Sequence, residues 1–175
     1  MYLRQPSQSE TTAWLRLSDS LFLESERYVT TITVREGSEY FRGLLLLISK
    51  DRRISEPEIV LMKRIGKALG LERNFCDNAI REILENDFIL NEPFEFSTKE
   101  LAKKFIKDGL MLAGSDNDIH AFEEEWLKST AEKNDLDVEW FLRERENTAR
   151  RRIDLDVHLE VDDLTVEYSK RGPSS

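Results

Sequence analysis

An internal repeat at an offset of 65 residues is the feature that most restricts how this 175-residue chain can fold. Residues about 44–71 align without gaps on residues about 109–136, and each copy contains an apolar helix, the pattern Asp-x-x-Ile-x-x-x-Glu and an amphipathic helix. A single copy cannot bury its apolar face alone. The repeat therefore predicts a mainly α fold, a pseudo-symmetric helical bundle in which each copy covers the other. The aligned pairs include Leu45 and Leu110, Asp51 and Asp116, Ile54 and Ile119, Glu58 and Glu123, and Leu71 and Leu136.

Start and stop signals place the helices within residues 38–152, which we expect to form one helical domain. Ser55 with Glu58, and Ser97 with Glu100, have the spacing of a capping box, in which hydroxyl and carboxylate satisfy the free amides at a helix start. A helix is therefore predicted to begin after each serine. The remaining signals are a helix stop at Gly70 and a break at residues 91–93.

Outside this domain, two segments are predicted to form β-structure. Within the N-terminal flank, residues 1–37, the segment Tyr28–Val34 is rich in β-branched residues and favours a short strand. Apolar and polar residues alternate from Ile153 to Val161 and again from Leu164 to Tyr168, with Asp162 and Asp163 between the two runs, which predicts a small C-terminal β-hairpin over residues 153–169. Because an isolated hairpin is marginally stable in water, we expect it to dock on the helical body, to pair with the strand near Ile32, or to pair with another chain. Residues 170–175 are expected to be a loose tail.

The two copies of the motif resemble those of the tellurite-resistance TerB family and its relatives, over about residues 38–142. In these all-helical proteins each half carries a motif close to Asp-Gly-x-Ile-x-x-x-Glu between two helices. The resemblance implies that the acidic residues of the two loops lie near one another and bind a divalent metal ion. Carried over residue by residue, this role falls on Asp51, Glu58, Asp116 and Glu123.

This chain departs from the family pattern at the residue after each aspartate. The family glycine is replaced by Arg52 in the first copy and by Asn117 in the second. Asparagine adopts a left-handed backbone conformation more readily than arginine does. The second loop is therefore expected to keep the family geometry better than the first.

The second loop also has the better set of oxygen ligands. A hard cation such as Ca²⁺ needs several oxygen atoms converging on one point, and Asp116, Asp118 and Glu123 supply carboxylates there. In the first loop, Arg52 and Arg53 can neutralise the neighbouring carboxylates. Ca²⁺ is therefore the favoured cofactor and the second loop its favoured site. In the structural alternative, the aspartate caps the next helix and the first-turn glutamate suits the helix dipole, with no ion bound.

Composition argues against several classes of protein. With 26 Lys and Arg against 35 Asp and Glu, the net charge of −9 argues against binding to nucleic acid or to an anionic membrane. The longest apolar run, Leu44–Ile48, is too short to span a membrane, and no secretion signal is recognised, so we expect a cytoplasmic protein. Cys76 is the only cysteine, which excludes a disulfide within the chain. Neither His120 nor His158 belongs to a recognisable triad, and no catalytic residue is predicted.

The charge is distributed unevenly between the two copies. Residues 115–146 hold 11 acidic and 4 basic residues, a balance of −7, whereas residues 50–81 hold 5 acidic and 8 basic residues, a balance of +3. We expect this dipole to steer association, either head to tail between copies or with a partner protein, and to weaken with salt.

Together these features predict a non-catalytic protein-interaction module. By the resemblance, it would act in a stress or tellurite-resistance-type system and bind a divalent ion through its acidic loops. The alternative is a purely structural domain that associates with itself or serves as an adaptor, without an ion site. An enzyme ranks third among the hypotheses.

Overall fold

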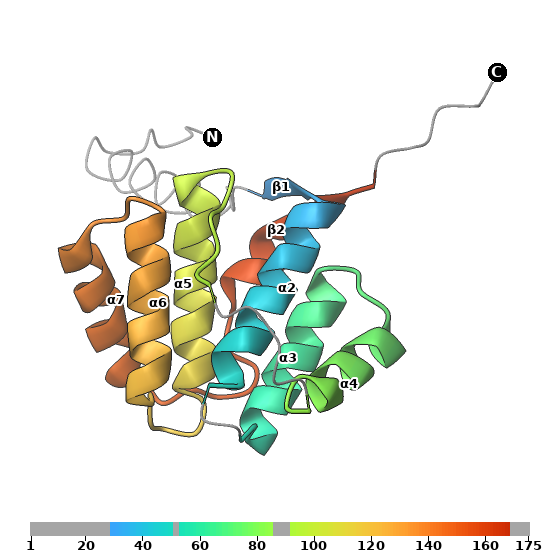
Figure 1. Cartoon of the computed structure of the whole chain (residues 1–175), viewed down its shortest axis with the longest axis horizontal. Helices are drawn as coiled ribbons and strands as arrows, with labels where there is room; N and C mark the ends of the chain where they lie inside the picture. Colours follow the sequence, from blue (N-terminus) through green and yellow to red (C-terminus); the bar gives the residue numbers. More distant parts are fainter. Residues whose placement is uncertain (1–28, 51–52, 86–91, 169–175) are drawn as a thin grey trace, which may run out of the picture.

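The computed structural model describes residues 29–50, 53–85 and 92–168, and within them the protein is mainly helical (Figure 1). Six α-helices account for most of these residues, as the sequence predicts. One short 3₁₀-helix and two short strands complete the described elements. In chain order they are β1 (Thr30–Thr33), α2 (Val34–Ile48), α3 (Glu56–Ala68), α4 (Arg73–Glu82), α5 (Lys99–Ala113), α6 (Ala121–Lys133), α7 (Val138–Ala149), η1 (Glu160–Asp163) and β2 (Leu164–Glu167).

The 65-residue offset of the sequence repeat is also the offset of the helix boundaries. Helices α2 and α5 begin and end 65 residues apart, as do α3 and α6, and α4 and α7 begin 65 residues apart. Each half therefore contains three helices, one more than the repeated motif itself covers. The equivalence extends to hydrogen bonds, since the N–H of Leu71 donates to the carbonyl of Gly66 at 2.9 Å and that of Leu136 to Ala131 at 3.0 Å.

The residues that end α3 and α6 have the same left-handed backbone. Gly70 has φ of +70° and Asp135 has φ of +51°. Such a residue turns the chain and lets the last carbonyls of the helix accept hydrogen bonds. The predicted helix stop at Gly70 is confirmed.

Polar side chains cap the starts of α2, α3, α5 and α7, and the sequence predicted two of these starts. Ser55 and Glu58 form the expected capping box before α3. The predicted start at Ser97 is wrong by one residue, because the hydroxyl of Thr98 accepts the hydrogen bond from Leu101 N–H at 3.1 Å and α5 begins at Lys99. The hydroxyl of Ser97 donates instead to the carboxylate of Glu36 in α2.

The predicted C-terminal β-hairpin is wrong. Of residues 153–168, only β2 is a strand, and it pairs in parallel with β1, with Ile32 opposite Val166. The strand predicted near Ile32 is confirmed over Thr30–Thr33, and pairing with it was one of the expected arrangements. Two parallel neighbours cannot be joined by a tight turn, and here the whole helical body separates them.

The alternating residues before β2 are held by a helix rather than by a strand partner. The guanidinium of Arg64 in α3 donates to the carbonyls of Leu155, at 3.1 Å, and Val157 and forms an ion pair with Asp162. Leu159 and Val161 are buried in the core. The alternation therefore reflects one buried face of an irregular segment, whose backbone carbonyls find a side-chain donor.

The core lies between the helices of the two halves. Helices α2 and α5 are buried along most of their length and pack against each other, with α3 and α4 on one side and α6 and α7 on the other (Figure 1). Within the described residues, no helix has the length and apolar character that crossing a membrane requires. The largest fully buried side chains include Tyr40, Phe41, Phe105, Phe141, Leu44 and Leu61.

Gly66 allows α3 and α4 to approach closely, so its replacement by alanine should destabilise the protein. A Cβ atom at this position would overlap the Sγ of Cys76 and lie 3.2 Å from the ring of Phe41. Overpacking of this kind costs about 1–3 kcal/mol, which we expect Gly66→Ala to show in urea unfolding. Gly37→Ala in α2 is the matched control, because its new Cβ would meet its nearest neighbour at an ordinary 3.4 Å. Equal stability of the two variants would contradict the prediction.

Candidate functional site

The predicted ligands Glu58 and Glu123 occupy equivalent places in the first turns of α3 and α6. Their side chains are 6% and 1% exposed. The carboxylate of Glu58 accepts a hydrogen bond from the N–H of Ser55 at 2.6 Å, and that of Glu123 accepts one from the N–H of His120 at 3.1 Å. Both glutamates therefore accept a capping hydrogen bond, and both lie in the first turn of a helix, where the structural alternative expects the glutamate to suit the helix dipole.

The predicted ligands Asp116 and Asp118 are exposed in the loop between α5 and α6. An oxygen of Asp116 accepts a hydrogen bond from the N–H of Asp118 at 3.1 Å. Between them, Asn117 has φ of +72°, the left-handed conformation that asparagine tolerates. The fifth predicted ligand, Asp51, lies outside the described residues, as does Arg52.

The two repeated motifs lie at the same end of the bundle. Helix α2 ends and α3 begins at the end where α5 ends and α6 begins (Figure 1). The ammonium group of Lys50, just after α2, lies 5.4 Å from the ring centroid of Trp126 in α6, and burial lowers the pKa of this lysine. Among the described residues, which do not include Asp51, no group of three or more His, Cys, Asp or Glu is arranged to hold a metal ion.

A pocket with an apolar floor and a basic rim lies between α3 and α4. Its volume is about 510 Å³, and Leu71 and the buried Cys76 form the apolar part of its lining. We call it the basic pocket. Its basic lining residues are Lys63, Arg64, Lys67 and Arg73.

One carboxylate offsets part of this positive charge. Asp77 lies 3.0 Å from the ammonium of Lys63 and 3.8 Å from the guanidinium of Arg73. Arg64 is held by the C-terminal segment as described above. Lys67 is exposed, and its ammonium group makes no hydrogen bond or ion pair within the described residues. The rim therefore keeps a net positive charge over an apolar floor.

The basic pocket adjoins a second apolar depression. Leu71 lines both, and the second, of about 380 Å³, is formed by α2, the segment between α3 and α4, α4 and the β2 end of the chain. Phe75 and Tyr168 line it although their side chains are 55% and 61% exposed. The α3–α4 side of the molecule thus combines apolar surface with positive charge, a combination typical of interaction sites.

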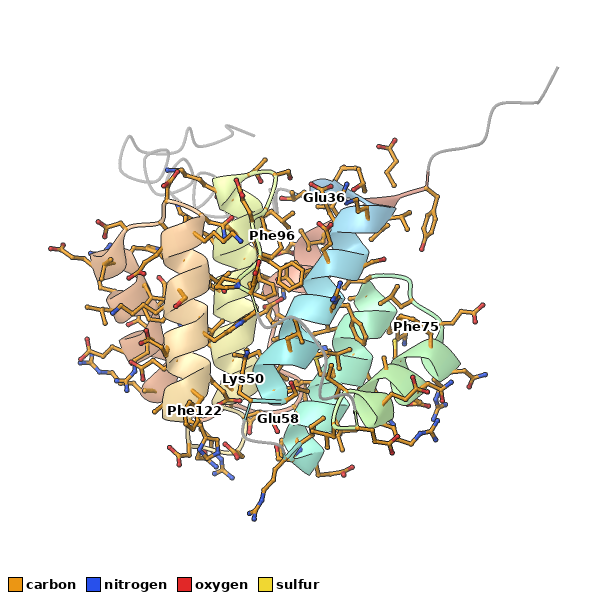
Figure 2. The ribbon with its side chains drawn as sticks, viewed as in Figure 1. Glu36, Lys50, Glu58, Phe75, Phe96 and Phe122 are labelled. Carbon is orange, nitrogen blue, oxygen red and sulfur yellow. The ribbon has the colours of Figure 1, made fainter. Side chains whose placement is uncertain are left out.

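The opposite side presents an apolar side chain among acidic ones. Phe122 in the first turn of α6 is 71% exposed. Asp118 before it and Glu125, three residues later on the same face of the helix, are also exposed. We call these three residues the acidic face. Phe122 and Phe75 lie at opposite sides of the molecule (Figure 2).

A buried carboxylate that the sequence analysis did not single out joins the C-terminal segment to the bundle. Asp108 in α5 is 1% exposed and accepts hydrogen bonds from the hydroxyl of Tyr40 at 2.8 Å and from the N–H groups of Glu160 and Val161 at 2.6 and 2.9 Å. Burial raises the pKa of Asp108 to about 7 in spite of these three donors. One sequence signal was present, since Asp108 is an acidic residue among the apolar positions of α5.

Charged residues surround Asp108 in a polar cavity of about 260 Å³. The carboxylate of Glu160 pairs with the ammonium groups of Lys104 and Lys107, each at 3.1 Å. Burial opposes ionisation of Glu160, but these two lysines outweigh it and lower its pKa. Thr148 also lines this cavity, and its hydroxyl donates to the backbone carbonyl of Glu144 at 2.9 Å rather than to a side chain that could act as a general base. The cluster therefore serves to dock η1 on α5.

Comparison with models of known protein families, with curated proteins and with solved structures gave no match for this chain. The structure defines the protein as a mainly helical bundle with a two-stranded parallel sheet. Its assignment to the TerB family remains a prediction from the sequence motif.

Proposed function

We propose that this protein is a non-catalytic, TerB-like protein-interaction module that binds its partners through two oppositely charged sides. The observation that supports this most is the segregation of charge together with exposed apolar side chains. The net-positive window of residues 50–81 includes α3 and all of α4 except Glu82, and the net-negative window of residues 115–146 includes α6 and most of α7. These helix pairs lie on opposite sides of the bundle (Figure 1).

The arrangement suits protein recognition because each side offers both apolar area and charge. Exposed apolar groups such as Phe75 and Phe122 supply binding energy when they are buried in an interface. The surrounding charges select the partner and increase the association rate. Among the described residues, the Thr148 hydroxyl in the polar cavity donates to a backbone carbonyl, and burial together with the nearby charge of Asp77 raises the pKa of the Cys76 thiol, so neither pocket presents an activated nucleophile.

Capture of partners from the cells that express this protein tests the proposal. The wild type is compared with a variant whose basic pocket is reversed, Lys67→Glu/Arg73→Glu, and with Arg42→Glu/Arg81→Glu, which has the same net charge but is altered away from the pocket. We expect a captured protein that the first variant loses and the second retains. Identical captured proteins for all three would contradict recognition through the basic pocket, and a parallel comparison at Phe122 and Glu125 tests the acidic face.

A divalent ion at the repeated loops is a second proposal. It is favoured by the equivalent, buried positions of Glu58 and Glu123 at the same end of the bundle. A ligand that binds only the folded state raises the melting temperature as its concentration rises. We expect Ca²⁺ to do so, and Asp116→Ala combined with Glu123→Ala to abolish the rise. The absence of any shift at millimolar Ca²⁺, Mg²⁺, Zn²⁺ or Mn²⁺ would refute this proposal without affecting the first.

A role in a stress or tellurite-resistance-type system is an extension of the proposal that rests on the resemblance alone. Its test is the tellurite tolerance of cells that lack this protein, compared with cells that express the wild type or the Lys67→Glu/Arg73→Glu variant. Unchanged tolerance in all three would remove this extension and leave the interaction module to be judged by the capture experiment.

A further inference from the structure

The two sides of this molecule complement each other in both shape and charge. The acidic face presents a protruding phenyl ring, Phe122, with the carboxylates of Asp118 and Glu125 nearby in the chain. The basic pocket presents an apolar hollow bordered by Lys63, Lys67 and Arg73, with other lining residues given above. A phenyl ring can pack against the apolar part of this hollow while the neighbouring carboxylates pair with the basic side chains at its border.

The size of the pocket fits a ring of this kind. An apolar cavity of about 150 Å³ suffices for a benzene molecule, and the basic pocket measures about 510 Å³. Burial of a phenylalanine side chain from water contributes about 1.5–3 kcal/mol. The pocket therefore has room for the Phe122 ring and part of the first turn of α6.

The occupant must come from another molecule. Phe122 and Glu58 mark the end of the bundle with the repeated loops, whereas Phe75 of α4 lies on the far side from Phe122 (Figure 2). Phe122 is held in a regular helix, so it cannot reach the basic pocket of its own chain. A second copy, however, carries the same acidic face on a rigid element.

We propose that copies of this chain associate head to tail, with Phe122 of one copy seated in the basic pocket of the next. This inference rests on the proposed function and names a partner for it, namely the chain itself. Asp118 and Glu125 of the first copy face Lys67 and Arg73 of the second. Because the two contacting surfaces differ, each added copy leaves one acidic face and one basic pocket open, and the assembly extends as a filament or closes as a ring.

The contact is small and charged, so the association is weak and depends on salt. One ring and a few ion pairs bury less than the roughly 1,200 Å² typical of stable complexes. Raising the ionic strength from about 0.1 M to about 1 M shortens the Debye length from about 10 Å to about 3 Å and screens these pairs. Self-association should therefore be visible at high protein concentration and low salt.

Sedimentation velocity of the purified full chain over a series of protein concentrations tests the proposal. We expect the weight-average sedimentation coefficient of the wild type to rise with concentration at low salt and to fall back towards the monomer value at high salt. The pocket variant Lys67→Glu/Arg73→Glu and the face variant Phe122→Ala/Glu125→Lys should each weaken self-association at least about tenfold, or about 1.4 kcal/mol. All four positions are exposed, and circular dichroism melting verifies that both variants fold.

Two controls match these variants in charge change. Arg42→Glu/Arg81→Glu repeats the charge change of the pocket variant elsewhere, and Glu139→Lys/Leu142→Ala repeats the change of the face variant on α7, with the same spacing and at exposed positions. Both controls should self-associate like the wild type. Equal weakening by a control and its matched variant would overturn the proposal, because it would show that net charge alone governs association.

Mixing the two variants distinguishes a head-to-tail contact from a symmetric one. The pocket variant keeps an intact Phe122 and the face variant keeps an intact pocket, so an equimolar mixture should form a dimer and nothing larger. A mixture that stays monomeric, a mixture that forms longer assemblies, or a wild type that is monomeric at both salt concentrations would each overturn the proposal. If the capture experiment still shows pocket-dependent binding of another protein, the interaction module stands while head-to-tail association is rejected.

Discussion

Replacement of Asp108 by alanine should lower the free energy of unfolding by about 3–5 kcal/mol, more than any other single substitution considered for this protein. The carboxylate accepts three hydrogen bonds in a fully buried site. Its removal leaves the hydroxyl of Tyr40 and the N–H groups of Glu160 and Val161 without an acceptor, and each such buried donor costs about 1–3 kcal/mol.

The loss should be concentrated in the C-terminal segment. Asp108 holds η1 against α5, and η1 leads directly into β2, which completes the parallel pair with β1. Hydrogen exchange should therefore show greater loss of protection at the amides of Thr165 and Val166 than in α6. Urea unfolding measures the overall effect.

Two control variants test whether the loss of stability is specific to the buried carboxylate. Tyr40→Phe removes one of the three donors and keeps the ring, so it should cost only about 1 kcal/mol. Glu132→Ala removes an exposed acidic residue from α6 and should change stability by less than about 0.5 kcal/mol. The free energy of unfolding of Asp108→Ala could instead lie within about 1 kcal/mol of the wild-type value, which is about the range of an ordinary surface substitution. That result would show that the buried network does not hold the C-terminal segment.

The same residue should make the protein less stable as the pH rises from 4 to about 7, an unusual direction for an acidic protein. The pKa of Asp108 is raised from 3.8 to about 7, chiefly by burial. Between these values the folded state keeps a proton that the unfolded state has lost, so the free energy of unfolding falls with rising pH. One pKa unit corresponds to about 1.4 kcal/mol, so from about pH 5 to about pH 7 the fall should be on the order of 2–3 kcal/mol.

At lower pH other carboxylates act in the opposite sense. Hydrogen bonds from Ser97 and Thr33 lower the pKa of Glu36, and Lys107 and Lys104 lower that of Glu160 against the effect of burial. Stability from these two residues is lost as the pH falls through their lowered pKa values, below about 4.5. The profile of the wild type should therefore have its maximum between these two regions.

Asp108→Asn is the test of the assignment, since the amide keeps the shape of the side chain but cannot titrate. Its stability should be lower than that of the wild type because one amide donor now meets the NH₂ group. Between about pH 5 and about pH 7 its profile should be flat, whereas the decline at lower pH should remain. A fall between about pH 5 and about pH 7 that is unchanged in Asp108→Asn would assign the effect to a different residue. Urea unfolding at a series of pH values measures both proteins.

The helical halves were accessible to sequence reasoning because their signals are local. The repeat, the capping box at Ser55 and Glu58, and the stop at Gly70 depend on residues within a few positions of each other along the chain. The one-residue error at Ser97 arises because two adjacent hydroxyls could both cap the helix, and a tertiary contact with Glu36 of another helix engages the first of them.

The C-terminal segment was not accessible in the same way. An alternation of apolar and polar residues requires only that one face be buried, and a strand partner is one of several ways to satisfy the backbone. Here Arg64, about 90 residues earlier in the chain, binds the carbonyls of Leu155 and Val157. No pattern within residues 153–161 indicates that Arg64 is the hydrogen-bond donor.

For the candidate sites too, some features follow from local sequence and others from tertiary packing. By itself the sequence determined the two halves, the capped helix starts and the opposite charge of the two halves, because helix signals and charge counts depend on neighbouring residues. Only the tertiary structure decided that Asp108 is buried beneath η1, that Lys63, Lys67 and Arg73 surround one apolar hollow, and that Phe122 protrudes on the other side. These features depend on which helices meet, and that is decided by packing between residues far apart in the chain.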